Sequence, residues 1–445
     1  MSLRAQKLQV IAKELVQEGL LSSKDEVSYA VASRKEIQKL IDSYTVDDST
    51  GAPANRELAL SLGDAVPIMD ELLEMAVREK ASDIHIEPTG EFLQVRFRID
   101  GVLEHRKVIP YNLHQRVLSR VKILSKLDVA EHRIPQEGRF GKTIDDKDLN
   151  FRVASYPTIH GEAAAIRVLS KENLLTLEDM GFSERDREVF KNIAQKPFGI
   201  FLVTGPTGSG KTTSLYAALN AIDKSQKHIL TVEDPVENEI EGACQTQVNV
   251  KAGLTFATVL RSMLRQDPDI IMVGEIRDEE TAEIACRAAM TGHLVLSTIH
   301  TNTAVGAISR LYDLGLKPYL LSASVIGLMT QRLVRRLCLE CREPAPVPQS
   351  LLSYLGEHAE GLKNYSSRGC AACRNQGYKG RVGIFEVIPL DDEMRVLINT
   401  RAPEVRIHER ARALGARTLW EDGLDKVHSG ITSLEEVFRV CGETL

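Results

Sequence analysis

The most chemically specific residues of this sequence form the run GPTGSGKT at positions 205–212. The run fits the pattern G-x-x-x-x-G-K-[ST], follows an apolar stretch and precedes a helix-compatible segment. Its glycines let backbone N–H groups surround phosphate oxygens, while Lys211 can reach the β and γ phosphates and the Thr212 hydroxyl can bind Mg²⁺. The alternative is a glycine-rich turn without a ligand. We expect a site for ATP and Mg²⁺ formed by Gly205, Pro206, Thr207, Gly208, Ser209, Gly210, Lys211, Thr212 and Thr213.

Hydrolysis of ATP also requires a carboxylate that orients or deprotonates the attacking water. Glu275 follows the apolar run 269–273 and is therefore the expected catalytic base. The aspartate that usually stands just before such a glutamate is replaced by Gly274. This departure leaves open which group besides Thr212 contacts magnesium.

Four of the seven cysteines form two C-x-x-C pairs, separated by 28 residues. Each pair can bring two sulfurs onto one face of a turn, and four thiolates make a closed tetrahedral site for structural Zn²⁺. Free buried thiols or a redox pair are the alternatives. The expected zinc ligands are Cys338, Cys341, Cys370 and Cys373, whereas Cys244, Cys286 and Cys441 have no partner at ligand spacing.

Five segments together resemble the secretion ATPase family, which drives type II secretion and type IV pilus assembly. Three of them are TVEDPVE at 231–237, LRSMLRQDPDIIMVGEIRD at 260–278 and GHLVLSTIHTN at 292–302. Two more, SDIHIEP at 82–88 and RIPQEGR at 133–139, precede them in the family's order. The resemblance implies a RecA-like ATPase domain, a preceding PAS-like α+β domain and assembly into a homo-hexamer.

The resemblance also implies roles for individual residues. Glu233 is the candidate for contacting magnesium or positioning water, with a plain strand-end turn as the alternative. His293 and His300 correspond to the family's sensors of the γ phosphate. Transition-state charge on that phosphate can be met by arginines of a neighbouring domain or subunit. The matching positions are Arg139, Arg152, Arg261 and Arg265.

These residues need a scaffold that brings distant parts of the chain together. The apolar runs 199–204, 228–232, 269–273 and 293–298 alternate with helical patterns, which is typical of a mostly parallel sheet covered by helices. Each run has a polar residue at its end or within two residues beyond it. Because ligands bind beyond the carboxyl ends of the strands in such sheets, we expect an α/β fold in which the four run ends meet at one site.

The chain is too long for a single core of usual size, since domains average roughly 150 residues. Alternating apolar and polar residues around the Asp100-Gly101 turn predict an antiparallel hairpin ahead of the ATPase segment. The expected units are a short N-terminal helical segment and linker at 1–60, an α+β domain at 61–172, and an ATPase domain at 173–445 that includes a zinc element at 335–380 and a helical part at 390–445.

Composition favours a globular protein, with 43% hydrophobic and 27% charged residues. The longest apolar runs have the length of strands and fall short of the ~20 residues that a bilayer crossing needs. The N-terminus lacks the apolar stretch of a signal peptide, which predicts a cytoplasmic location. A net charge of −6 and 5% aromatic residues disfavour a protein that grips nucleic acid.

The sequence therefore predicts a hexameric ATPase that powers assembly of pseudopilus or pilus fibres. The resemblance implies a place on the cytoplasmic face of the inner membrane, held there by an inner-membrane platform or cytoplasmic-domain anchor protein. Within the family, the four-cysteine element is typical of assembly and secretion members and is lacking in retraction motors. The alternatives are a nucleic-acid translocase or helicase with a RecA-like core, and an adaptor that senses nucleotide without hydrolysing it.

Overall fold

The computed structural model describes residues 65–169, 175–356 and 361–442. The expected helical segment and linker at 1–60 lie outside the described residues, and the expected boundary at 172–173 falls in an undescribed stretch. Residues Ala65–Leu445 form one compact unit. Across the described ranges, no helix has both the length and the apolarity to pass through a bilayer.

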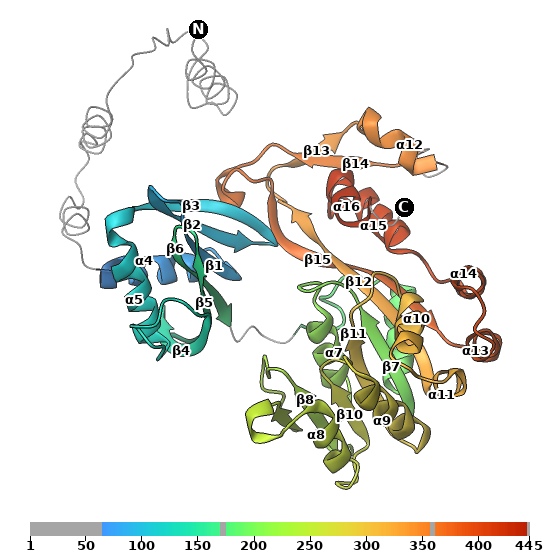
Figure 1. Ribbon diagram of the computed structural model, residues 1–445. Helices are drawn as coiled ribbons and strands as arrows, with labels where there is room; N and C mark the ends of the chain where they lie inside the picture. Colours follow the sequence, from blue (N-terminus) through green and yellow to red (C-terminus); the bar gives the residue numbers. More distant parts are fainter. Residues whose placement is uncertain (1–64, 170–174, 357–360, 443–445) are drawn as a thin grey trace. The chain divides into compact units, whose positions relative to one another are not determined.

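The first part of this unit is built on a six-stranded antiparallel sheet with the strand order β3-β2-β1-β6-β5-β4 (Figure 1). Leu93, Val95 and Phe97 alternate with more exposed residues along β2 and are fully buried. This part consists of α4 Ala65–Arg78, β1 Asp83–Pro88, β2 Phe92–Ile99, β3 Val102–Pro110, the 3₁₀ turn η1 Tyr111–Leu113, α5 His114–Leu124, β4 Gln136–Ile144, β5 Lys147–Thr158 and β6 Gly161–Leu169.

The hairpin predicted around Asp100-Gly101 is confirmed as β2 and β3. Both turn residues have positive φ angles, 49° for Asp100 and 86° for Gly101. An aspartate-glycine pair tolerates this left-handed conformation, and the turn type it forms matches the twist of the two strands.

The second part is built on a seven-stranded sheet with the order β15-β12-β7-β11-β10-β8-β9. All neighbouring strands are parallel except β12 and β15. Its elements are α6 Glu184–Ala194, β7 Gly199–Thr204, α7 Lys211–Asn220, β8 Ile229–Glu233, β9 Ala243–Gln247, η2 Val250–Ala252, α8 Phe256–Met263, β10 Ile270–Val273, α9 Glu279–Met290, β11 Leu294–Ile299, α10 Gly306–Asp313, α11 Pro318–Ser324, β12 Val325–Leu337 and β15 Tyr378–Pro389.

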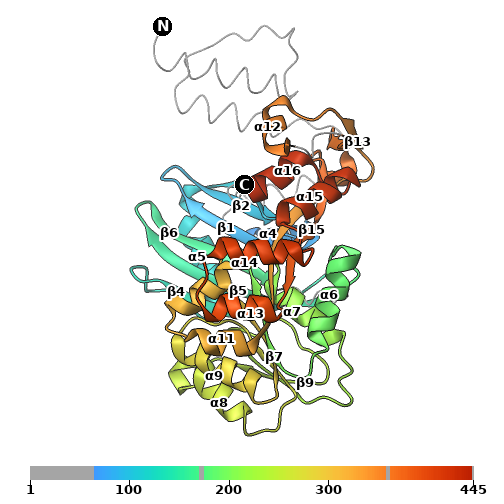
Figure 2. The ribbon, with the colours of Figure 1, turned by 90° about the vertical axis from the view of Figure 1, so that its right-hand side faces the viewer.

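Helices cover both faces of this sheet, as the fully buried strand β7 requires (Figure 2). Ile200 and Leu202 pack into the core on the side of α8 and α9, whereas Phe201 and Val203 pack into the core on the side of α6 and α7. Successive side chains of a strand point to opposite faces, so a strand covered on both faces is apolar throughout. The α/β fold predicted from the four apolar runs is confirmed, and each run lies within one residue of its strand.

Sequence patterns did not reveal the long antiparallel pair of β12 and β15. β12 lies beside β7, with Thr330 opposite Thr204, and so borders the loop that follows β7. Gln331 of β12 connects this strand to the loop and to α7. Its Nε2 donates to the Ser209 carbonyl at 2.6 Å, and its Oε1 accepts from the Ser214 hydroxyl at 2.5 Å.

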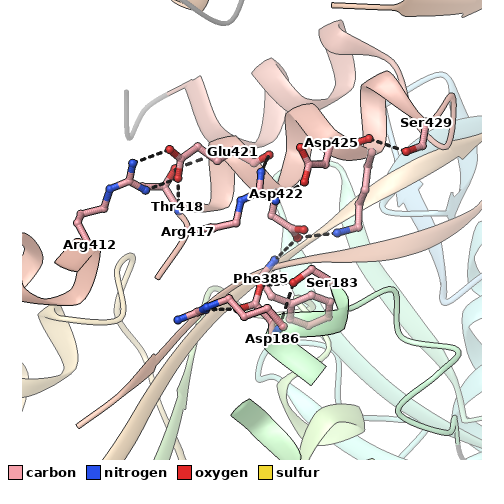
Figure 3. A network of polar contacts seen from close by, with 12 residues as sticks. Ser183, Asp186, Phe385, Arg412, Arg417, Thr418, Glu421, Asp422, Asp425 and Ser429 are labelled. Carbon is pink, nitrogen blue, oxygen red and sulfur yellow. Dashed lines mark hydrogen bonds and ion pairs between the residues drawn. The ribbon is translucent and has the colours of Figure 1, made fainter. Parts of the chain in front are cut away.

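The C-terminal elements surround the far end of this pair. They are β13 Arg342–Ala345, η3 Gln349–Leu351, α12 Leu352–Leu355, β14 Asn364–Ser367, η5 Ala371–Cys373, α13 Asp392–Asn399, α14 Glu404–Ala413, α15 Leu419–His428 and α16 Leu434–Cys441. A polar network joins α15 to β15 and includes the N-terminus of α6 (Figure 3). At its centre, Asp422 accepts from the Phe385 backbone N–H at 2.8 Å and pairs with Lys426 at 2.5 Å.

Candidate active site

The predicted phosphate-binding loop connects the end of β7 to the start of α7. Gly205, Gly208 and Gly210 have φ angles of 143°, 78° and 88°, which side chains disfavour. At Gly205 a Cβ atom would also lie 2.6 Å from the Gln331 carbonyl oxygen. The loop therefore needs glycine for its conformation, and at Gly205 also for the close approach of β12.

The Lys211 side chain turns back over this loop. Its ammonium donates to the carbonyl oxygens of Gly205 at 2.9 Å and Pro206 at 3.0 Å. The residue is only 9% exposed, and burial lowers its pKa below the ordinary value, although Glu275 opposes that effect. A cation held by neutral carbonyls can exchange these contacts for phosphate oxygens at little cost.

A cavity of about 500 Å³ opens beside the loop. The ends of β8, β10 and β11 reach the same cavity, because parallel strands present their carboxyl ends along one edge of the sheet. Its lining includes Thr207, Gly208, Gly210, Lys211, Thr212 and Thr213 from the loop and α7, together with Glu233, Asp234, Glu237, Gly274, Glu275, Thr298 and His300 from the strand ends. Gly205, Pro206 and Ser209 shape the loop without lining the cavity.

Glu275 lies just beyond β10 and has two partners. It forms an ion pair with Arg277, and its other oxygen lies 3.5 Å from Nε2 of His300. Burial, followed by the nearby Lys211, lowers the pKa of His300 below its ordinary value, with Glu275 opposing. His300 is thus neutral at neutral pH and can exchange a hydrogen bond with the carboxylate or with a water between them.

Glu233, at the end of β8, is 2% exposed and has several hydrogen-bond donors around it. Oε1 accepts from the Thr231 hydroxyl at 2.5 Å and the Gln245 amide at 3.0 Å, and Oε2 accepts from the Tyr216 hydroxyl. A carboxylate offers about four acceptor positions, so most of those on Glu233 are already used. This geometry favours a role in holding other groups over the direct magnesium or water contact expected from the sequence.

Comparisons with known proteins show the family of this chain. Residues 60–439 match the family model described as Type II/IV secretion system protein. The chain belongs to this family. Over 429 residues it is 45% identical to type II secretion system protein E of Pseudomonas aeruginosa, covering 91% of this chain and 85% of that protein. It is 46% identical to type II secretion system ATPase E of Vibrio cholerae, covering 88% and 78%. The resemblance drawn from the sequence motifs is confirmed.

The solved structures of a pilus motor and of an ATPase share the fold. The pilus retraction motor PilT with bound ADP matches with a TM-score of 0.56 and 27% identity, over 83% of this chain and 95% of that one. The ATPase DotB of Legionella pneumophila matches with a TM-score of 0.61 and 21% identity, over 83% and 94%. The latter likeness concerns the fold alone.

Of the two histidines that the family resemblance marked, only His300 lines the cavity. His293 precedes β11, and its Nδ1 lies 3.0 Å from the Ala288 carbonyl oxygen at the end of α9. The two histidines are separated by the length of β11, roughly 20 Å at about 3.3 Å per residue. His293 therefore lies away from this chain's own cavity, since it stands at the amino end of a strand whose carboxyl end borders the cavity.

Among the four arginines expected from the resemblance, Arg152 lines the cavity, and Arg139 lies opposite it in the register of β4 and β5. Arg261 pairs with Glu280 on the surface, and Arg265 is exposed just after α8; neither lines the cavity. Four further charged residues line the cavity although no sequence pattern marked them individually: Glu237, Arg167, Arg277 and Arg381.

Arg167 could have been found from strand register. Arg167 lies on β6, opposite Arg152 of β5. Arg139, Arg152 and Arg167 thus form a row across β4, β5 and β6. Arg152 pairs with Glu137 at 2.8 Å and Arg167 with Asp83 at 2.9 Å. Arg277 stands two residues after Glu275, within the GEIRD run already linked to the family.

The four cysteines predicted to bind a metal lie together. Their sulfurs are all within 4.8 Å of one another, and three of the separations are 3.7 to 3.8 Å. Four sulfurs around a zinc ion at bond lengths of about 2.3 Å would be roughly 3.8 Å apart. The donor set and its spacing fit a closed tetrahedral metal site.

Proposed function

We propose that this chain hydrolyses ATP and uses the energy to drive assembly of pseudopilus or pilus fibres in type II secretion or type IV pilus machinery. The observation that carries the proposal is the single cavity that Lys211, Thr212 and Glu275 all line. Two similarities support it: a relative of 46% identity is named type II secretion system ATPase E, and the pilus retraction motor PilT was solved with bound ADP.

In this proposal the loop binds the phosphates. Its backbone N–H groups and the dipole of α7 attract the anionic oxygens, and Lys211 leaves the carbonyls of Gly205 and Pro206 for the β and γ phosphates. The Thr212 hydroxyl and an acidic side chain of the cavity, Asp234 or Glu237, would hold Mg²⁺. Bound there, the metal would neutralise charge on the phosphate oxygens.

Glu275 then acts on the attacking water. The carboxylate accepts a proton while the water oxygen bonds to the γ phosphorus and the bond to the β-phosphate oxygen breaks, leaving ADP and phosphate. His300, neutral at neutral pH, can orient that water or the carboxylate from its position 3.5 Å away. Arg277 forms an ion pair with Glu275 and so limits the positions that the carboxylate can take beside the attacking water.

Arginines supply positive charge to the transition state. Arg152 and Arg167 line the cavity from the six-stranded sheet, and Arg139 continues their row at an exposed position. Such arginines can act within a chain or across to a neighbouring copy, with effects of roughly 10³ to 10⁵ in rate in other P-loop enzymes. We propose a homo-hexamer in which exposed members of this row, together with Arg261 and Arg265, are available to the next subunit.

The four-cysteine cluster has a structural role in this proposal. Cys338 directly follows β12, and Cys370 and Cys373 stand shortly before β15. A Zn²⁺ ion held by the four thiolates would close the long excursion between these paired strands and leave no coordination position for catalysis. The element also favours an assembly or secretion motor, and identity to the secretion relatives, 45%, exceeds identity to the retraction motor, 27%.

We further propose that the hexamer works at the cytoplasmic face of the inner membrane, bound through a platform or anchor protein of the machine. The support is the family, whose members compared here are named as components of secretion systems. No nucleic acid takes part.

The decisive experiment replaces Glu275 with glutamine. Loss of a catalytic base lowers turnover by about 10²- to 10⁴-fold, whereas binding of ATP to the loop should change little. Steady-state phosphate release and the affinity for a fluorescent ATP analogue measure the two quantities. Glu283→Gln, on the exposed face of α9 beside Arg287, is the matched control and should behave as the parent.

Retained turnover in Glu275→Gln would reject this residue as the base. The assay is repeated with single-stranded DNA and RNA at physiological salt, because strong stimulation by either would instead support a nucleic-acid translocase.

A further inference from the structure

Tyr216 occupies an unusual position behind the candidate active site. It is 1% exposed, lies in the middle of α7 and directs its hydroxyl toward the end of β8. The hydroxyl donates to Oε2 of Glu233 and is the acceptor for the backbone N–H groups of Glu237, at 3.3 Å, and Asn238, at 3.4 Å. One oxygen atom thus joins the helix, the strand end and the loop that follows the strand.

The other side of Glu233 completes the connection. The side-chain NH₂ group of Gln245, which donates to Oε1 of Glu233, also donates to the Asn238 carbonyl at 3.0 Å. The side-chain oxygen of Gln245 accepts from the Ile240 backbone N–H at 2.7 Å. The loop 234–242 contains no helix or strand, so these side-chain contacts fix its position. Glu233, Tyr216 and Gln245 form what we call the loop anchor.

The loop anchor connects two elements that both carry residues of the cavity. The loop presents Asp234 and Glu237 to the cavity, while α7 begins with Lys211 and Thr212. Residues four apart on a helix lie on one face, so Tyr216 stands directly below Thr212. Burial, and next the charge of Glu233, raise the pKa of Glu237, as expected for a carboxyl held close to another one.

We propose that Tyr216 is a positioning residue for ATP hydrolysis: its hydroxyl fixes the positions of Asp234 and Glu237 relative to Lys211 and Thr212. This inference rests on the proposed ATPase function. Nucleotide binding depends mainly on the loop 205–212, so the loss of the hydroxyl affects turnover much more than affinity.

Tyr216 also belongs to the hydrophobic core between α7 and the sheet, and a packing role alone must be distinguished from positioning. A phenylalanine fills the same space and removes only the hydroxyl. Tyr216→Phe therefore keeps the packing and tests the hydrogen bonds. Tyr312→Phe is the matched control, because the Tyr312 hydroxyl donates to the Ile398 carbonyl, away from the cavity.

The first measurement is amide hydrogen exchange in the full-length protein. In Tyr216→Phe the amides of Glu237 and Asn238 lose their acceptor, and we expect their exchange to accelerate roughly tenfold or more. Exchange in Tyr312→Phe should match the parent over the same loop. Unchanged exchange of residues 236–240 in Tyr216→Phe would overturn the anchor itself.

The second measurement is steady-state ATP hydrolysis. We expect kcat to fall roughly 10- to 100-fold in Tyr216→Phe with KM and nucleotide affinity within about threefold, as when a contact that matters mainly in the transition state is lost. Because Tyr216 and Glu233 hold the same loop and contact each other, the double variant with Glu233→Gln should lose less than the product of the two single losses. An unchanged kcat, a loss confined to affinity, or losses that multiply would each overturn the proposal.

The two measurements separate the inference from the proposed function. A parent protein that hydrolyses no ATP would reject the proposed function and, with it, the catalytic consequence of the anchor, while hydrogen exchange still decides whether the anchor exists. If Tyr216→Phe does not fold, Gln245→Met removes the other side chain that holds the loop and carries the same expectations.

Discussion

Two clusters of polar groups in this chain are built on opposite principles. In the network on α15 and its neighbours (Figure 3), charges lie beside opposite charges: Asp422 with Lys426, Arg412 with Glu421, and Arg417 with Asp425. Beside the cavity, Lys211 and Arg332 donate to backbone carbonyls, and among the described residues neither has a carboxylate partner.

The difference separates charges that stabilise the fold from charges that remain available. A buried ion pair with both partners satisfied is costly to break, because the remaining charge has no compensation. A buried cation held by carbonyls contributes little stability and keeps its charge for an incoming anion. Substitutions in the network should therefore lower stability, whereas substitutions at the cavity should lower activity.

The largest expected effect is on stability, in Asp422→Leu. This change leaves the buried Lys426 unpaired and the Phe385 N–H without its acceptor, and should lower the free energy of unfolding by about 3 to 5 kcal/mol. Urea unfolding measures the loss. The double variant with Lys426→Met should recover part of it, and a double variant no more stable than Asp422→Leu would show that the ion pair is not the cause.

Lys211→Met should produce the opposite pattern. Removing a preorganised donor from the phosphate site should lower ATP hydrolysis by on the order of 10²- to 10³-fold. The melting temperature should stay the same or rise, because the change removes a buried cation that has only carbonyl partners. Parallel activity and melting measurements check this, and a marked loss of stability would break the contrast between the two clusters.

Glu386→Gln has a smaller effect that depends on pH. Glu386 of β15 is 8% exposed, and burial, with Arg412 opposing, raises the pKa of its carboxyl from 4.5 to about 7. Between about pH 4.5 and pH 7 the folded state binds more protons than the unfolded state. The free energy of unfolding therefore falls as pH rises through this range. The difference of 2.5 units corresponds to roughly 3 kcal/mol at most.

Glutamine removes this penalty. The variant should be more stable than the parent at pH 8, and the gain should shrink toward zero near pH 5 in urea unfolding. Glu409→Gln, at an exposed position in α14 beside Arg406, is the control. A gain of equal size at both pH values would mean that titration of Glu386 does not explain it.

Local patterns predicted the features that depend on neighbours in the chain. The phosphate-binding loop, the Asp100-Gly101 hairpin and the four apolar runs were each visible in a short window. Glu275 and His300 reached the cavity as expected, since both follow parallel strands whose carboxyl ends meet. His293 lies away from the cavity because only the carboxyl end of β11 borders it.

Contacts between distant segments were beyond such patterns. The row of Arg139, Arg152 and Arg167 depends on the pairing register of three strands, and a shift by one residue would turn a side chain to the opposite face. The C-x-x-C spacing predicted four ligands, but their approach to within 4.8 Å depends on how β12 and β15 pair.

The amino-acid order was sufficient for the family and for the positions of the glycine-rich loop and Glu275, because short and specific runs carry these features. It could not show that Gln331 clamps a loop 122 residues away, or that the Tyr216 hydroxyl meets Glu233 and the loop after it. Those contacts are weak individually and form only when several elements pack at once, so they follow from the assembled core of the protein.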